Sequence, residues 1–398
     1  MSDALKALRK NTWTLDEWYA QDVAGNAEEL IEGELYMWGS CEDGSLAQNQ
    51  QEVLRSSPAQ IPGSTWKDSG TGTNFSSVTK SDGSLWSWGP NNDGRLGLGD
   101  RNARSSPTQV GTDTTWHRAH GTYSSTLATK TDGTLWSWGS NGGGVLGLNH
   151  TGKRSAPTQI GTEDTWDKDT FDTSLARNWA IAVKTNGTLW TWGDNEKGSL
   201  GQNNKTFYSS PKQVGTGTDW ALGYAKVAAG LVGSAAIKTD GTLWTWGNNS
   251  TKQLGTDTPA YTDCTSPRQV GTSTDWKQIW MGYIGSAYGL KTDGELWVWG
   301  SNSRGGLGLP TGAYPGERES PMALGGTNDW KQIGTGNKSI GAVKTDGTLW
   351  AWGQNEHGQC GQGNRTDQES PKQVGTSSDW SAVWGKEATL AARKNNPG

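Results

Sequence analysis

The chain has 398 residues and a formal net charge of -5, and only 31% of its residues are hydrophobic although it holds 25 Trp and 58 Gly. No basic run offsets the negative charge, which argues against nucleic acid as a partner, because binding a phosphate backbone depends on clustered Lys and Arg. No apolar run approaches the ~18 residues of a membrane span, and the N-terminus lacks the apolar core of a signal peptide. The three scattered cysteines indicate free thiols rather than a disulfide framework. Because free thiols are typical of a reducing compartment, we expect a protein made in the cytoplasm.

Residues 1–32 differ from everything after them and are expected to form an N-terminal arm. Thr14-Leu15-Asp16-Glu17 fits a capping box, in which Thr14 caps a helix start and Glu17 reaches back to it. This pattern predicts a short helix from Leu15 to about Ala24, closed by Gly25.

Aromatic side chains give this arm an apolar face. Leu15, Trp18 and Tyr19 would share one side of the helix, and Trp13 lies just ahead of it. This face either packs back on the rest of the chain or docks on another protein. We expect docking, because an aromatic-rich segment outside the fold is costly to leave exposed.

From residue 33 onward the chain is an internal repeat built around a Trp-Gly pair. The pair begins at Trp38, Trp88, Trp138, Trp192, Trp246, Trp299 and Trp352, so successive copies lie 50 to 54 residues apart. Copies at that period indicate one repeat domain, residues 33–398, arranged as a ring or a stack.

Each repeat predicts short antiparallel strands joined by tight turns. Lys130-Thr131-Asp132-Gly133 leads into Leu-Trp-Ser-Trp-Gly, and Asp-Gly supplies the positive φ angles of a hairpin. Because side chains alternate along a strand, Trp136 and Trp138 point to the same face. A regularly placed Pro begins the last strand of each repeat, where a missing N–H is tolerated.

Most of the tryptophans follow the repeat and are therefore expected in the core. A second series closes each repeat at Trp66, Trp116, Trp166, Trp220, Trp276, Trp330 and Trp380. A ligand platform would not be needed in every repeat, whereas a core ring would. Trp179, Trp280 and Trp384 break the pattern and are the better candidates for an exposed contact.

The two ends of the repeat region complement each other. The chain stops just after Lys394, where a hairpin should turn, and the strand around Leu35 lacks its usual partner. We expect residues 389–394 to pair with that strand, because the pairing removes two open sheet edges. A closed propeller is therefore favoured over an open stack.

The pattern Leu-Trp-Ser-Trp-Gly-x-Asn-x-x-Gly-x-Leu-Gly, complete at residues 85–97 and 135–147, resembles the regulator-of-chromosome-condensation (RCC1) repeat. The resemblance covers residues 33–398 and implies an all-β, seven-bladed β-propeller closed by its N- and C-terminal strands. The Trp-rich form with Gly-Thr-x-x-x-Trp endings looks like the prokaryotic and marine-phage branch. Neither the protruding wedge nor the basic tail of the family's GTPase exchange factors is visible in the sequence.

Residues that could carry chemistry do not assemble into a recognisable set. The four histidines are far apart or, for His117 and His120, placed three apart on an expected strand, which separates them and disfavours zinc. Asp194-Asn195-Glu196 suggests calcium, yet the equivalent Ser140-Asn141-Gly142 has no carboxylate. We expect no enzyme activity, no cofactor and no metal.

A partner site is expected where the repeats vary. The loop between Trp-Gly and Pro is longest in the fifth and sixth repeats, which places Tyr261 and Tyr314 on adjacent blades, with Asp263 and Arg318 beside them. Tyrosine is favoured at protein interfaces. Ordinary solvated loops are the alternative.

The expected function is a non-enzymatic, protein-binding or structural propeller. From the resemblance, we expect a phage virion component, in capsid decoration, tail or host adhesion, anchored by the N-terminal arm to other virion proteins. The alternative is a regulatory propeller, either an exchange-factor-like partner of a GTPase or a protein inhibitor of an enzyme. A propeller enzyme would need carboxylates clustered at the central channel.

Overall fold

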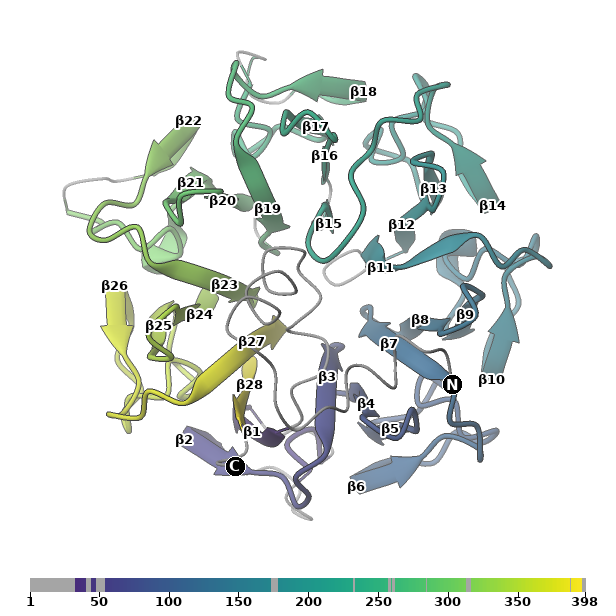
Figure 1. The fold of residues 1–398 in the computed structure, drawn as a ribbon, viewed down its shortest axis with the longest axis horizontal. Coiled ribbons are helices and arrows are strands. Elements are labelled where there is room, and N and C mark those ends of the chain that lie inside the picture. Colours follow the sequence, from purple (N-terminus) through teal and green to yellow (C-terminus); the bar gives the residue numbers. More distant parts are fainter. Residues whose placement is uncertain are drawn as a thin grey trace, which may run out of the picture.

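A computed structural model gives the structure of the chain. It describes residues 33–40, 44–47, 54–172, 178–231, 233–256, 259, 262–283, 285–312, 316–386 and 388–395. These residues form an all-β propeller around a central channel, as expected (Figure 1). The predicted helical arm is not part of this described fold, because residues 1–32 lie outside it, and the boundary at residue 32 stays a prediction.

Helical structure in the described residues is limited to 3-10 turns. They are η2 (Gly142–Gly144) and η3 (Ser303–Gly305). Within the same residues, no helix has the length and apolar character needed to cross a membrane.

The strands fall into four classes by their distance from the channel. The innermost are β3 (Trp66–Thr71), β7 (Trp116–Gly121), β11 (Trp166–Asp172), β15 (Val227–Ala229), β19 (Trp276–Met281), β23 (Trp330–Thr335) and β27 (Trp380–Lys386). The second are β4 (Ser76–Lys80), β8 (Ser125–Lys130), β12 (Trp179–Lys184), β16 (Gly233–Ile237), β20 (Ser286–Lys291), β24 (Ser339–Lys344) and β28 (Thr389–Asn395). The third are β5 (Leu85–Gly89), β9 (Leu135–Gly139), β13 (Leu189–Gly193), β17 (Leu243–Gly247), β21 (Leu296–Ser301), β25 (Leu349–Gly353) and β1 (Gly33–Gly39). The outermost are β6 (Arg104–Gln109), β10 (Arg154–Gln159), β14 (Tyr208–Gln213), β18 (Cys264–Gln269), β22 (Glu317–Ala323), β26 (Gln368–Gln373) and β2 (Arg55–Gln60).

The number of blades differs from the prediction. Five separate four-stranded sheets form blades, not seven. The other strands make one continuous eight-stranded sheet, because Gly33 of β1 pairs with Trp66 of β3 and joins two sets of four strands. In Figure 1 these sets, β27–β28–β1–β2 and β3–β6, lie side by side around the same channel. The repeat period could not reveal this cross-pairing, since it depends on where the first strand begins.

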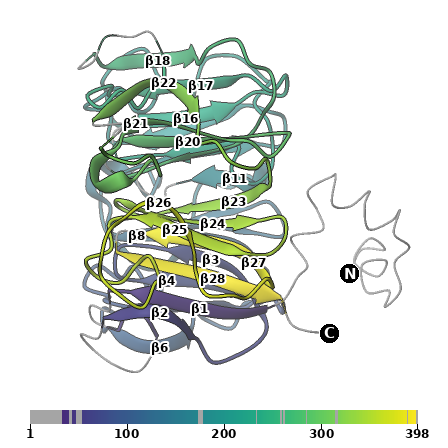
Figure 2. The ribbon, with the colours of Figure 1, turned by 90° about the vertical axis from the view of Figure 1, so that its left-hand side faces the viewer.

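The predicted pairing of the chain ends is confirmed. β28 pairs antiparallel with β1 over the whole of both strands, from Gly33 opposite Asn395 to Gly39 opposite Thr389. Gly33, at the start of β1, and Asn395, at the end of β28, lie on the side of the propeller that carries the turns between second and third strands. We call this side the turn face. Figure 2 views the stacked sheets edge-on, with this face on the right. Closure of the ring thus places Gly33 and Asn395 together at the turn face.

The Trp-Gly rings form the predicted core and also join neighbouring blades. Trp38, Trp88, Trp138, Trp192, Trp246, Trp299 and Trp352 are all fully buried. Each indole Nε1 donates to a backbone carbonyl of the preceding repeat, for example Trp138 to Arg95 at 2.9 Å. The bond from Trp38 to the carbonyl of Gln359, at 2.8 Å, does the same across the ring closure. Each buried indole ring stabilises the fold through its packing, and its hydrogen bond leaves no buried N–H without a partner.

The turn of each hairpin is built as the sequence predicts. In the β8–β9 hairpin, Gly133 has φ 83°, and Asp132 Oδ1 accepts from the backbone N of Thr134 at 3.0 Å. Trp136 Nε1 then donates to Thr134 Oγ1 at 2.8 Å. Lys130 Nζ lies 4.2 Å from the centroid of the Trp136 ring, a cation–π contact repeated in the other blades.

Candidate functional site

The innermost strands enclose a cavity of about 60 Å³ in the central channel. We call it the channel cavity. Its lining from β7 and β11 includes the polar residues Arg118, His120 and Asp172 beside Phe171, whereas its lining from β19 and β27 includes Trp280 and Trp384. The channel cavity therefore has a charged side and an aromatic side.

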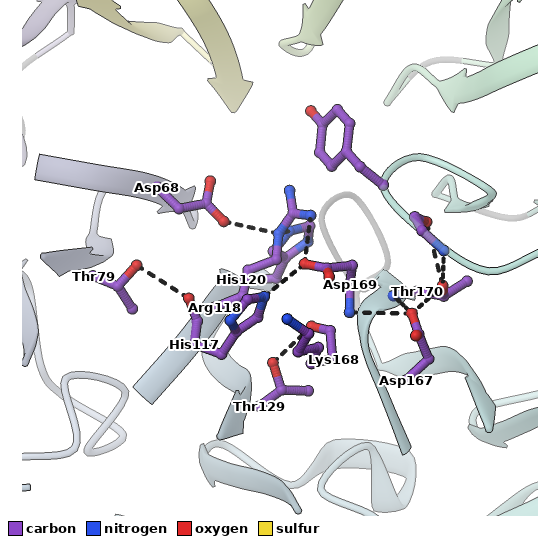
Figure 3. Close-up of polar contacts among 12 residues, drawn as sticks. Asp68, Thr79, His117, Arg118, His120, Thr129, Asp167, Lys168, Asp169 and Thr170 are labelled. Carbon is purple, nitrogen blue, oxygen red and sulfur yellow. Dashed lines mark hydrogen bonds and ion pairs between the residues drawn. The ribbon is translucent and has the colours of Figure 1, made fainter. Parts of the chain in front are cut away.

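Arg118 of β7 is the centre of the polar side. Its Nε lies 2.8 Å from Asp68 Oδ2 on β3, and its Nη1 lies 3.9 Å from Asp169 Oδ1 on β11 (Figure 3). The guanidinium carbon is 4.3 Å from the centroid of the Tyr224 ring, a third contact of cation–π type. Only 5% of Arg118 is exposed, so these partners replace the water that the charge has lost.

The carboxyl of Asp68 is held in its charged form by this neighbourhood. Burial raises its pKa, but the Arg118 guanidinium, together with His120 and Lys67, more than offsets burial and leaves the pKa below its usual value. Asp68 and Arg118 therefore act as a charged pair at neutral pH.

Two histidines of β7 reach two aspartates of β11. His117 Nε2 lies 2.8 Å from Asp169 Oδ1, and His120 Nδ1 lies 3.3 Å from Asp172 Oδ1. Because His120 Nε2 accepts a bond from Arg118 Nε at 3.1 Å, its proton belongs on Nδ1, which donates to Asp172. The sequence reasoning missed these carboxylate partners, which lie about one repeat away from the histidines.

Asp172 also connects β11 to the next blade. Its Oδ2 accepts from the backbone N of Ala229 in β15 at 2.8 Å, while its Oδ1 faces His120. The network of Asp68, Arg118, His120 and Asp172 therefore links β3, β7, β11 and β15. The network consists of salt bridges and hydrogen bonds. The described residues contain no cluster of three or more His, Cys, Asp or Glu side chains that could hold a metal.

A loop of residues 221–226, the channel loop, reaches into the channel from the blade of β15. The Tyr224 hydroxyl accepts from Gln332 Nε2 on β23 at 2.7 Å, and its burial raises its pKa. The carbonyl of Ala225 accepts from the backbone N of Ile279 at 2.9 Å. The carbonyl of Gly223 accepts from Thr170 Oγ1 at 3.3 Å. The channel loop thus contacts three other innermost strands, β11, β19 and β23.

Positive φ angles shape this loop. Gly223 has φ 107° and Ala225 has φ 53°, and an Ala in that region is uncommon. The sequence signal for the loop is the interval from Trp220 to Lys238, which is 18 residues against 14 from Trp116 to Lys130. Sequence reasoning compared the intervals between Trp-Gly and Pro and so missed this one.

Of the predicted partner residues, the structure describes two. Asp263 Oδ2 lies 2.6 Å from Lys205 Nζ, and its Oδ1 accepts from Asn248 Nδ2 at 2.8 Å. Arg318 lies half-buried on the outermost strand β22, opposite Gly300. Neither contributes to the channel cavity, and their role with a partner stays a prediction.

The other predicted site residues lie outside the described part of the chain. They are Tyr261 and Tyr314 in the loops, and Trp13, Leu15, Trp18 and Tyr19 in the arm.

The tryptophans that break the repeat are not surface contacts. Trp179 is only 3% exposed and packs in the core, so that prediction was wrong. Trp280 is also buried, and Trp280 and Trp384 both line the channel cavity. Trp384 Nε1 is a buried donor with no hydrogen-bond partner among the described residues. Trp280 and Trp384 depart from the repeat because they lie on the innermost strands β19 and β27, which face the channel.

A family model described as the RCC1-like domain matches residues 118–391, and a model of the RCC1 repeat matches residues 82–126. The chain belongs to the RCC1-like domain family. Among curated proteins it is 32% identical to the ultraviolet-B receptor UVR8 of Arabidopsis thaliana over 227 residues, 54% of this chain and 49% of that protein. It is 27% identical over 206 residues to the probable E3 ubiquitin-protein ligase HERC6 of Homo sapiens, covering 50% of this chain and 20% of that protein. The chain therefore spans about half or less of the curated relatives it matches.

Solved structures agree on the fold. Prp20p of Saccharomyces cerevisiae superposes with a TM-score of 0.80 at 18% identity, covering 94% of this chain and 95% of that one. Human WBSCR16 superposes with a TM-score of 0.78 at 19% identity, covering 92% of this chain and 100% of that one. At these identities the likeness concerns the fold alone.

Proposed function

We propose that this protein is a non-enzymatic, protein-binding propeller whose partner contacts the central channel. The observation that carries the proposal is the channel cavity, which is charged on the side of Arg118 and aromatic on the side of Trp280 and Trp384. Aromatic surface supplies binding energy when it is covered, and fixed charges beside it select the partner. Leu222 of the channel loop, 39% exposed, adds an apolar contact next to Tyr224.

The relatives support protein recognition as the general task. The structure of Prp20p was described together with its binding properties to Gsp1p and histones, and another structure holds the same yeast protein bound to Kap60. HERC6 is named as a ubiquitin ligase, but the match covers 20% of its length. We therefore carry over protein binding and not ligase activity.

The test compares two exposed apolar residues on different parts of the propeller. Leu222→Asp alters the channel loop, whereas Phe207→Asp alters a site just before the outermost strand β14, where Phe207 is 56% exposed. We expect Leu222→Asp to lower partner recovery at least about tenfold and Phe207→Asp to leave it unchanged. Equal recovery by both variants, at equal melting temperature, would refute binding at the channel.

Two narrower settings belong to this proposal. The first is a virion component of the Trp-rich phage type, with the arm residues Trp13, Leu15, Trp18 and Tyr19 attaching the propeller to other virion proteins. The second is a regulatory partner of a GTPase or an enzyme, for which the fold of Prp20p is the supporting observation. Mass spectrometry of purified particles separates them: the first requires the protein in stoichiometric amounts, and its absence would leave the second.

A further inference from the structure

A groove of about 390 Å³ lies between the blade of β13 and β14 and the blade of β17 and β18, which are neighbours in Figure 1. We call it the rim groove. It is lined by the segments 201–203 and 214–220 on one side and by residues that include Trp244 and Pro267 on the other. Among the described residues, none lines both this groove and the channel cavity. Its volume falls within the range of about 300–1,000 Å³ that is typical of small-molecule sites.

A polar residue at one repeated position helps to form the groove. Ten positions after the Trp of the Trp-Gly pair, the second and third repeats have Leu98 and Leu148, which pack against tryptophan clusters. The fourth repeat has Gln202 there. Its Nε2 donates to Thr191 Oγ1 at 3.2 Å and to the carbonyl of Lys212 at 3.1 Å, both in its own blade. This repeat therefore has an amide where the others fill the space with an aliphatic side chain.

A missing side chain opens the groove further. Three positions before the Trp that closes the second repeat stands Asp113, whose carboxylate pairs with Lys130. The corresponding residue before Trp220 is Gly217. A Cβ added to Gly217 would lie 3.9 Å from Trp220 Nε1 and 2.9 Å from Oδ1 of Asp219. Any side chain at this position would thus cover the edge of the indole that the glycine leaves open.

The tryptophan rings at the groove are also arranged differently. In the β7–β9 part of the ring, Trp116 and Trp136 meet edge to face with centroids 5.9 Å apart, and the same contact recurs in the other blades. Among the described rings, Trp220 contacts Trp246 at 6.3 Å and makes no such contact with Trp244. The channel loop follows Trp220 directly, so an isolated bridge holds this residue where the other blades have a strand. The lengthened channel loop therefore accompanies the opening of the rim groove.

The polar groups of the groove suit a neutral ligand. Lys238 Nζ lies 3.0 Å from Asp219 Oδ2, so the two charges compensate each other. Asn203 is exposed, and Gln202 Oε1 accepts a hydrogen bond from no described residue. These amides lie beside the half-buried ring of Trp244. A sugar ring matches this combination, because its C–H face packs on an indole and its hydroxyls both donate to and accept from amides.

We propose that the rim groove binds a neutral sugar, as a monosaccharide unit of a glycan, with the ring against Trp244 and its hydroxyls bonded to Gln202 and Asn203. This site is separate from the channel in position and in chemistry. The proposal is therefore independent of the partner proposed for the channel.

Saturation-transfer difference NMR of the full chain tests the site with neutral methyl glycosides of glucose, galactose, mannose, fucose and N-acetylglucosamine. We expect transfer to the ring protons of at least one sugar, with a Kd of about 1 mM. The variant Gln202→Leu/Gly217→Asp restores the residue types of other repeats and should weaken binding at least about tenfold, because it fills the groove. The matched control Gln362→Leu/Ser377→Asp alters the equivalent positions of the seventh repeat and should bind as the unaltered chain does.

Asn203→Gly gives a second readout that does not depend on filling the groove. Asn203 has φ 57°, which glycine adopts without strain, so the change removes only the side-chain amide and should lower the affinity about fivefold. Transfer to none of the sugars, or equal affinity in the filled variant and its control, would overturn the proposal. Protein-partner recovery that falls in Gln202→Leu/Gly217→Asp, without sugar binding by the unaltered chain, would assign the groove to a protein instead.

Discussion

The third strands of the blades are nearly interchangeable, whereas the innermost strands are not. β5 and β9 both read Leu-Trp-Ser-Trp-Gly and show the same burial pattern, while β7 reads Trp-His-Arg-Ala-His-Gly and β19 reads Trp-Lys-Gln-Ile-Trp-Met. Every third strand packs against the neighbouring blade and so meets the same demand each time. Innermost strands face the channel, where each blade meets a different set of neighbours. Repetition therefore marks what holds the ring together, and departure from it marks where a partner can be recognised.

The largest effect should come from a repeated tryptophan. Trp138→Ala removes a fully buried ring and its bond to the carbonyl of Arg95, so we expect a loss of about 4–5 kcal/mol in the free energy of unfolding, measured by urea titration. Trp384→Ala, in the channel, should cost less than half as much, because that ring is half-buried and its Nε1 bonds to nothing in the described residues. Equal losses would remove the distinction between the two classes of strand.

Arg118→Met should lower the free energy of unfolding by about 3 kcal/mol at pH 7, a smaller loss than for Trp138→Ala, because Asp68 and Asp169 lose their cation. The folded-state pKa of Asp68 is depressed, so the pair stabilises the fold above the ordinary carboxyl pKa and ceases to do so as pH falls through the folded value. The deficit of the variant should therefore be largest near neutral pH and shrink below about pH 4.

The matched control for that variant is Arg304→Met. Arg304 is half exposed and pairs with Glu356 at 2.9 Å and Asp367 at 3.1 Å. An exposed pair contributes less than about 1 kcal/mol, so the control should stay near the unaltered stability at every pH. A pH-independent deficit in Arg118→Met would show that packing, and not charge, gives Arg118 its role.

The smallest effect is expected where one repeat departs from the others in a third strand. Tyr36 of β1 stands where the other third strands have Trp, and its hydroxyl donates to Glu34 Oε2 at 2.7 Å. Trp297 makes the same kind of bond to Glu295, at 2.6 Å. Tyr36→Trp should therefore change the free energy of unfolding at pH 8 by less than about 1 kcal/mol.

Alkaline pH separates Tyr36→Trp from the unaltered chain. Burial, with the hydrogen bond and charge of Glu34, raises the pKa of Tyr36 to about 12. A raised folded pKa gives stability that is fully present below the unfolded value of 10.0 and is lost as pH rises through the folded one. Between pH 8 and pH 11.5 the melting temperature should fall further in the unaltered chain than in the variant. Equal falls in the two proteins would contradict a raised pKa for Tyr36.

Much of the architecture was predictable because it depends on local or periodic signals. Asp132-Gly133 specifies its turn within four residues, and the Trp-Gly interval reports the repeat. The pairing of β1 with β28 followed from counting where the repeat stops. The merging of two blades through Gly33 and Trp66 did not follow, since it involves a single cross-strand pair.

The site was beyond sequence reasoning for a physical reason. Arg118 meets Asp68 and Asp169, which lie about 50 residues before and after it, and neither interval carries a motif. Those positions come together because the neighbouring innermost strands β3, β7 and β11 pack against one another at the channel. Tyr224 reaches the same place because the interval from Trp220 to Lys238 is four residues longer than that from Trp116 to Lys130. Its hydroxyl accepts a hydrogen bond from Gln332 on β23.

The sequence by itself determined the β-propeller, its tryptophan core and its closure, because these features arise from alternation along strands and from identical contacts repeated at one period. The tertiary structure alone decided how the blades are divided and which charges share the channel. Those outcomes depend on how non-equivalent innermost strands meet around an axis, and the free energy of a buried ion pair depends on neighbours that the chain supplies from different repeats.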